Sequence, residues 1–164
     1  MAVKVRSSKG FSLIELMIVI AVLGIVLAIA APNFTAYRDK TNLKEAARGI
    51  SSDMLLAKQR AVSESRNYQI DFSEAANTYT IKQETALNSG IYNDLSTKPV
   101  GAGNTAIKIL GTPSFSSGVS YVTFQPRGTC NPFGSLKLKH DRVLLPATIT
   151  TQITGRVRVV YDES

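Results

Sequence analysis

The sequence contains only one cysteine and one histidine, and these two shortages exclude several kinds of site. Cys130 has no partner cysteine, so the chain forms no intramolecular disulfide bond, and the redox compartment cannot be inferred from it. We expect its thiol to be an inert small side chain near a turn. His140 has no second histidine or cysteine cluster at metal-ligand spacing. We therefore predict no metal site and expect His140 at the surface or on an edge strand.

Motifs for catalysis are missing as well. No serine lies in a Gly-x-Ser-x-Gly motif, so a Ser-His-Asp site has no support. The stretch 101–103 lacks the third glycine of a dinucleotide-binding loop and has no strong strand before it, which is typical of an ordinary loop. Asp53 and Glu64 are expected to be solvent-facing helix charges. These observations predict a protein that is not an enzyme and uses no cofactor.

Charge is almost absent from one long stretch near the N-terminus. From Phe11 to Ala31 there are 21 residues, and Glu15 is the only charged one. A helix of that length spans about 31 Å, the thickness of a bilayer's hydrocarbon core. Three cations precede it, and the positive-inside rule then places the N-terminus in the cytoplasm and the remainder of the chain outside. Lys4, Arg6 and Lys9 are these cations, and without them the formal charge falls from +7 to +4 (7 − 3).

Glu15 is the feature that a simple membrane segment does not explain. A carboxylate at the centre of a spanning helix costs roughly 2.5–3.5 kcal/mol. One alternative is a cleaved signal peptide ending at residues 28–30, but Glu15 and the following Pro32 disfavour it. Another is a plain single-pass anchor with Glu15 at the lipid interface.

The sequence "GFSLIE" at 10–15, followed by an apolar run and "APNF" at 31–34, resembles the N-terminus of type IV pilins and type II secretion pseudopilins. The resemblance implies that a prepilin peptidase cuts after Gly10 and N-methylates Phe11 on the cytoplasmic side of the membrane. It also implies an assembly role for Glu15. A carboxylate that is costly alone is accommodated when it pairs with the terminal amine of a neighbouring subunit.

The periodicity of apolar residues predicts the fold class. Steps of three and four predict one helix from about Ser12 to about Ser65, kinked but not ended at Pro32. Alternation then predicts a hairpin of strands 68–72 and 78–83, and residues 85–105 are expected to form a long loop. Further strands are expected at 107–110, 119–124, 136–139, 148–153 and 156–161, with turns at 125–128 and 154–155.

These elements give an α+β fold with an antiparallel β-sheet domain, and the resemblance implies a pilin-like arrangement in which the long N-terminal helix packs on that domain. We divide the chain into a leader (1–10), a transmembrane and assembly helix (11–31), an amphipathic second half of the helix (32–66) and a β-rich periplasmic domain (67–164).

Two short C-terminal motifs narrow the resemblance. "FQPRGT" at 124–129 and "ITGRVRVV" at 153–160 resemble the GspH/FimT group of minor pseudopilins and minor pilins. Many FimT-like members carry paired cysteines, which Cys130 alone cannot provide. The resemblance implies a minor subunit that primes or caps a type IV pilus or a type II secretion pseudopilus. Its implied partners are prepilin peptidase, other pilins or pseudopilins, and the inner membrane, with the C-terminal domain in the periplasm.

Basic residues gather in the C-terminal part of the chain. Alternate strand residues face the same way, so Arg156 pairs with Arg158, and Lys137 with Lys139, while Arg142 follows in sequence. A charged edge strand exposed to solvent explains these residues, and so does an anion-binding face. FimT-like minor pilins are linked with DNA uptake through a Gly-Arg-x-Arg element, so DNA is an alternative partner. A single-pass exported binding protein is the alternative from a different class.

Overall fold

The computed structural model describes residues 10–161, apart from the side chains of residues 29–33. The leader residues 1–9 and residues 162–164 therefore lie outside the described part. The chain divides into two compact units, one up to Tyr37 and the other from Arg38 onward, and each is considered by itself. We call the second unit the domain.

The helix α1 extends over Leu13–Glu64, as the sequence predicted, and continues through Pro32. It begins where the Ser12 carbonyl accepts the N–H groups of residues 15 and 16, at 3.1 and 3.2 Å. It ends in a Schellman motif, because Ser65 has a φ of 53° and the Arg66 N–H donates to the Ala61 carbonyl. Within the part of the chain that the structure describes, no helix combines the length and the apolar character needed to cross a membrane.

The domain part of α1 buries one stripe of side chains in the core. The stripe steps by three and four residues and contains three alanines, which permit close packing. Its members are Leu43, Ala47, Ile50, Met54, Ala57 and Ala61. They belong to the same buried cluster as the inward-facing strand residues, so the helix and the sheets share one core.

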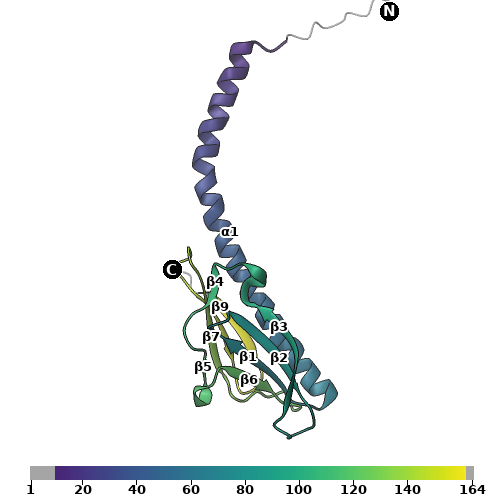
Figure 1. Cartoon of the computed structure of the whole chain (residues 1–164). Coiled ribbons are helices and arrows are strands. Elements are labelled where there is room, and N and C mark those ends of the chain that lie inside the picture. Colours follow the sequence, from purple (N-terminus) through teal and green to yellow (C-terminus); the bar gives the residue numbers. More distant parts are fainter. Residues whose placement is uncertain (1–9, 162–164) are drawn as a thin grey trace, which may run out of the picture. The chain divides into compact units, whose positions relative to one another are not determined.

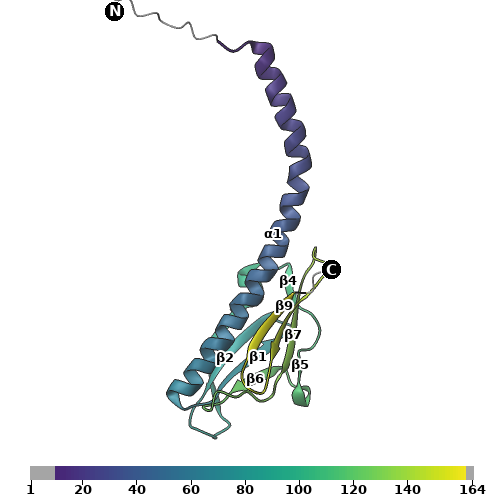
Figure 2. The same ribbon diagram turned by 180° about the vertical axis from the view of Figure 1, so that it is seen from behind.

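Two antiparallel sheets complete the domain (Figures 1 and 2). The first has the strand order β3-β2-β1-β6, and the second has the order β4-β7-β8-β9 with β5 also paired to β7. The strands of the first sheet are β1 (Tyr68–Ser73), β2 (Thr78–Glu84), β3 (Tyr92–Pro99) and β6 (Tyr121–Phe124). Those of the second are β4 (Ile107–Ile109), β5 (Ser114–Phe115), β7 (Gly134–His140), β8 (Ala147–Thr151) and β9 (Val157–Tyr161). Two short 3-10 helices, η1 (Val100–Gly103) and η2 (Ser116–Gly118), lie between strands. The predicted α+β fold is confirmed.

The loop predicted for 85–105 is wrong in its second half. Residues 92–99 form β3 and residues 100–103 form η1. β3 lies at the edge of its sheet, and most of its side chains are exposed. An edge strand without a buried face shows no alternation of apolar and polar residues, which is why the sequence pattern missed it. The two-residue strand β5 was too short to give a pattern.

The position expected for His140 is also wrong. Its side chain is 3% exposed, and β7 lies inside its sheet rather than at an edge. His140 is the last of the inward-facing residues of β7, after Leu136 and Leu138. The alternation in "LKLKH" continues through the histidine, and this pattern could have predicted its burial.

Candidate functional site

The predicted processing site lies just before the helix. Gly10 and Phe11 are both exposed, and neither is part of α1, which begins at Leu13. A protease binds its substrate in an extended form, so a scissile bond outside the helix is accessible without unfolding. Cleavage between these two residues remains a prediction to which the local structure presents no obstacle.

Glu15 lies in the first turn of α1, where a carboxylate is favoured by the helix dipole. Its side chain is exposed, and the described residues provide no ion-pair partner for it. An assembly role through a cation of another subunit therefore remains a prediction.

The helix segment after Glu15 is apolar on every side. Each large apolar side chain from residue 13 to residue 27 is between 44% and 76% exposed within the chain. A helix that is apolar all round needs a lipid or protein environment, because no face of it is suited to water.

Sheet pairing brings four cations onto the outer surface of the second sheet. Lys108 on β4 is directly opposite Lys139 on β7. Arg158 on β9 is opposite Thr150 on β8, and Thr150 is in turn opposite Ser135 on β7, so Arg158 lies on the same side of the sheet as Lys137 and Lys139. We call the surface formed by Lys108, Lys137, Lys139 and Arg158 the basic face. Its side chains point away from the core, since the residues between them on β7 are buried.

Few acidic groups neutralise the basic face. Lys108 lies 3.4 Å from Asp141, and both side chains are about half exposed. The other three cations have no ion pair within the described part of the chain. Lys108 was missed in the sequence because it lies 29 residues before Lys137, and only the strand register brings it to this surface.

The structure places the other two predicted basic residues differently. Arg156 is exposed and precedes β9, two residues from Arg158, so it extends the basic face. Arg142 lies beyond the end of β7, with its Nη1 atom 3.8 Å from Oδ2 of Asp39 on the helix. Arg142 therefore does not share the strand surface of Lys137 and Lys139, and its part in anion binding stays a prediction. The sequence could not show this, because Asp39 is more than 100 residues away.

The two C-terminal motifs meet in space as a pair of turns. In one turn the Gly128 N–H donates to the Gln125 carbonyl, and in the other the Gly155 N–H donates to the Gln152 carbonyl. A Cβ atom on Gly155 would lie 2.2 Å from the carbonyl oxygen of Gly128, so the turns touch through their backbones. Lys58 of the helix donates to the Gly155 carbonyl at 3.0 Å and holds the second turn against α1.

Cys130 is buried beside these turns. Its backbone N–H donates to the Ile153 carbonyl, and its thiol donates to the Gln152 carbonyl at 2.9 Å. Burial raises the pKa of the Cys130 thiol, which keeps it protonated and unreactive. The expectation of an inert side chain near a turn agrees with this environment.

Of the two helix charges expected to face solvent, Glu64 is exposed, but the Asp53 side chain is only 16% exposed, so the expectation is wrong for Asp53. Asp53 accepts hydrogen bonds from Lys98 and from the Tyr79 hydroxyl at 2.6 Å. Glu64 accepts from the Tyr68 hydroxyl at 2.7 Å, and burial together with this bond raises the pKa of Tyr68 to about 12. Both carboxylates connect α1 to the first sheet.

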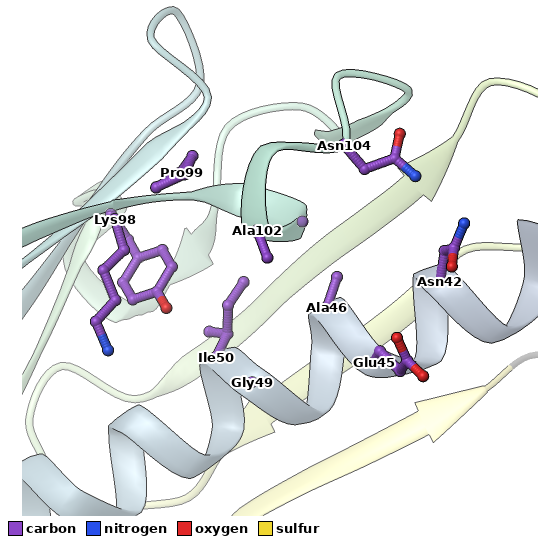
Figure 3. A pocket seen from close by; sticks show the side chains of 11 residues that line it. Asn42, Glu45, Ala46, Gly49, Ile50, Lys98, Pro99, Ala102 and Asn104 are labelled. Carbon is purple, nitrogen blue, oxygen red and sulfur yellow. The ribbon is translucent and has the colours of Figure 1, made fainter.

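A hollow of about 460 Å³ lies between the helix and the segment around η1 (Figure 3). Small residues line it, including Ala46 and Gly49 on the helix and Ala102 opposite them, with Asn42 and Asn104 at one end. The described residues contain no group of histidine, cysteine, aspartate or glutamate side chains that could hold a metal ion. The polar and charged side chains that line the hollow include Glu45, Tyr79 and Lys98.

Comparison with known proteins finds a matching sequence motif, related pilin sequences and solved structures of similar fold. Residues 5–31 match the prokaryotic N-terminal methylation motif. The type IV major pilin protein PilA of Myxococcus xanthus is 30% identical over 125 residues, covering 73% of this chain and 56% of that protein. The type IV wide pilus major component PilA4 of Thermus thermophilus is 35% identical over 86 residues, covering 52% and 56%. The chain thus spans about half the length of the curated relatives it matches.

Two solved structures share the fold. The minor pseudopilin EpsH from the type 2 secretion system of Vibrio cholerae aligns with a TM-score of 0.59 at 13% identity, covering 75% of this chain and 99% of that one. The type IV minor pilin FimU of Pseudomonas aeruginosa aligns with a TM-score of 0.57 at 17% identity, covering 78% and 98%. At such identities the likeness concerns the fold alone.

Proposed function

Because this chain carries the N-terminal motif and the fold of the type IV pilin and pseudopilin superfamily, we propose that it is a minor fibre subunit. Prepilin peptidase removes residues 1–10, and the subunit then joins a type IV pilus or a type II secretion pseudopilus through its N-terminal helix. There it primes or caps the fibre rather than forming its bulk. The role is structural and involves no catalysis by the chain.

One observation carries this proposal. The helix from residue 13 to residue 27 exposes large apolar side chains on all sides, with a single carboxylate in its first turn. Before assembly, the inner membrane covers this surface, with the domain in the periplasm. The sequence supports this location through its 21-residue apolar stretch and the three preceding cations. In the fibre, helices of other subunits cover the same surface.

The assignment as a minor subunit has narrower support. The sequence relatives named above are major pilins, whereas the two structural neighbours are a minor pseudopilin and a minor pilin. The two C-terminal motifs, on which the resemblance to the GspH/FimT group rests, meet through Gly128 and Gly155. Neighbouring genes for secretion components or for other minor pilins would decide which machine it serves.

Fibres sheared from cells provide the test. A minor subunit should be present in them in much smaller amounts than the major pilin, and absent when prepilin peptidase is deleted. Absence from fibres of peptidase-containing cells, with the protein intact in their membranes, would contradict the proposal. Amounts equal to those of the major pilin would contradict only its minor role.

The basic face supports a second candidate function, which is DNA binding. Three of its four cations have no ion pair among the described residues, and Arg156 extends it toward the turn at Gly155. Cations at strand spacing contact phosphates without reading base sequence. A subunit with this face outward would hold DNA along the fibre.

A further inference from the structure

The loop between β7 and β8, residues 141–146, holds an apolar side chain in full exposure. Leu144 is 99% exposed, more than any other large apolar side chain that the structure describes. Its neighbour Val143 is partly buried against the core, and the Val143 N–H donates to the His140 carbonyl. The base of the loop is therefore fixed, and Leu144 projects from it.

The loop lies where the helix enters the domain. Oδ1 of Asp39 lies 3.6 Å from Nε2 of His140, and its Oδ2 atom lies 3.8 Å from Nη1 of Arg142. The Arg142 N–H also donates to Nδ1 of His140 at 3.2 Å, which ties the loop to the end of β7. Asp39 is the second residue of the domain, so these contacts hold the loop beside the first turn of its helix.

The chain between this turn and the apolar stretch is short. Arg38 is seven positions after Ala31, which corresponds to about 10 Å if helical and to at most about 25 Å if extended. The headgroup layer on each side of the hydrocarbon core is about 6 Å thick. If Ala31 lies at the edge of the core, the first turn of the domain helix is within reach of the membrane surface.

Exposed cations lie on the first turn of the domain helix and on the loop itself. Arg38 and Lys40 are exposed on the helix, and the Arg142 side chain is 76% exposed. Among the described residues, two carboxylates on these segments already face cations, since Asp39 faces Arg142 and Asp141 lies 3.4 Å from Lys108. An exposed apolar side chain among cations is the combination by which protein segments bind an anionic lipid surface.

We propose that this loop docks on the anionic surface of the membrane that holds the subunit before assembly, with Leu144 inserted among the lipids. The docking rests on the proposed function, because the apolar helix must first be anchored there. It would fix the orientation of the domain against the membrane, and the contact must break when the subunit leaves for the fibre.

Because the chain contains no tryptophan, a single tryptophan introduced by substitution reports on its own position alone. Full-length protein is reconstituted in vesicles of phosphatidylethanolamine and phosphatidylglycerol, some with brominated acyl chains. The variant Leu144→Trp should show blue-shifted emission that brominated lipid quenches. The matched control is Leu87→Trp, an exposed leucine in the loop after β2, where Arg66 donates to the Thr85 carbonyl at the other end of the domain helix. Its tryptophan should remain unshifted and unquenched.

A third variant separates the two proposals. Leu23→Trp lies in the apolar stretch and should be quenched whenever the helix is inserted. If Leu23→Trp is quenched but Leu144→Trp behaves like the Leu87 control, the docking proposal is wrong and the anchoring stands. If Leu23→Trp is not quenched either, the anchoring itself has failed.

Two further conditions test the chemistry of docking. Vesicles of phosphatidylcholine alone should reduce the quenching of Leu144→Trp, and so should the added substitutions Arg38→Gln and Lys40→Gln. Neither change should reduce the quenching of Leu23→Trp. A blue shift at residue 144 that grows with protein concentration and is insensitive to brominated lipid would show that a second copy covers Leu144. That result would overturn the proposal.

Discussion

Lys98 on the edge strand β3 holds both carboxylate oxygens of Asp53 on the helix, at 2.9 and 2.8 Å (Figure 3 shows its side chain extending toward α1). The Asp53 side chain is 16% exposed and also accepts the Tyr79 hydroxyl. One carboxylate thus connects α1 with both β2 and β3. This contact fixes the strand that has no buried face of its own.

We expect Asp53→Ala to lower the free energy of unfolding by about 1–3 kcal/mol, because it leaves the Tyr79 hydroxyl without its acceptor in a largely buried place. Amide exchange should accelerate most in β3. Asp141→Ala is the matched control, since it removes a carboxylate whose pair with Lys108 is half exposed and should change stability by less than about 1 kcal/mol. Equal effects in the two variants would contradict the role given to Asp53.

The same contact shows why the sequence predicted some elements and not others. The helix and the inner strands carry apolar residues at their own period, so 13–64 and the hairpin at 68–84 could be predicted locally. β3 is held by partners 45 residues away, such as Asp53, and has no local pattern. For the candidate site, alternation predicted the shared side of Lys137 and Lys139. Lys108 joins these lysines only through the pairing register of β4 with β7, and Arg142 is held away from them beside Asp39 of the helix. Neither relationship leaves a local pattern in the sequence.

Gly155 should not tolerate a side chain. Its φ is 67°, and a Cβ atom would lie 2.2 Å from the carbonyl oxygen of Gly128, so Gly155→Ala must separate the two turns. We expect a loss of at least about 1 kcal/mol in unfolding free energy, measured by chemical denaturation. Gly49→Ala is the opposite control, since Gly49 is inside the helix with open space around it and should gain about 0.5–1 kcal/mol. A neutral Gly155→Ala variant would show that the turns can move apart freely.

Processing should leave Phe11 at the N-terminus. The bond after Gly10 lies outside the helix and is exposed, so the peptidase can reach it. Mass spectrometry of protein extracted from membranes should detect a chain that begins at a methylated Phe11. Recovery of residues 1–10 would contradict the proposed processing, and a chain that begins at Ala31 or Pro32 would favour a signal peptide.

Replacing Glu15 with alanine should prevent assembly without unfolding the domain. The side chain is exposed and has no ion-pair partner among the described residues, so the fold does not depend on it. Removal of the charge makes membrane insertion easier, by up to about 2.5–3.5 kcal/mol at a central position. The variant should remain in the membrane but be absent from sheared fibres, where immunoblotting measures it. Normal incorporation into fibres would refute the pairing of Glu15 with a neighbour's terminal amine.

The basic face should bind DNA in a salt-dependent way if the second candidate function is correct. Each phosphate contact contributes roughly one unit to the slope of log affinity against log salt concentration. For residues 34–164, which include the entire buried core, Arg156→Gln with Arg158→Gln should weaken duplex binding and flatten this slope by about two units. The matched control is Arg48→Gln with Arg60→Gln, which removes the same charge from exposed helix positions and should leave the slope nearly unchanged. Fluorescence anisotropy at several salt concentrations measures both variants. Equal losses in the two variants would mean that net charge alone attracts DNA, and the basic face would then be only a solvent-exposed side of the sheet.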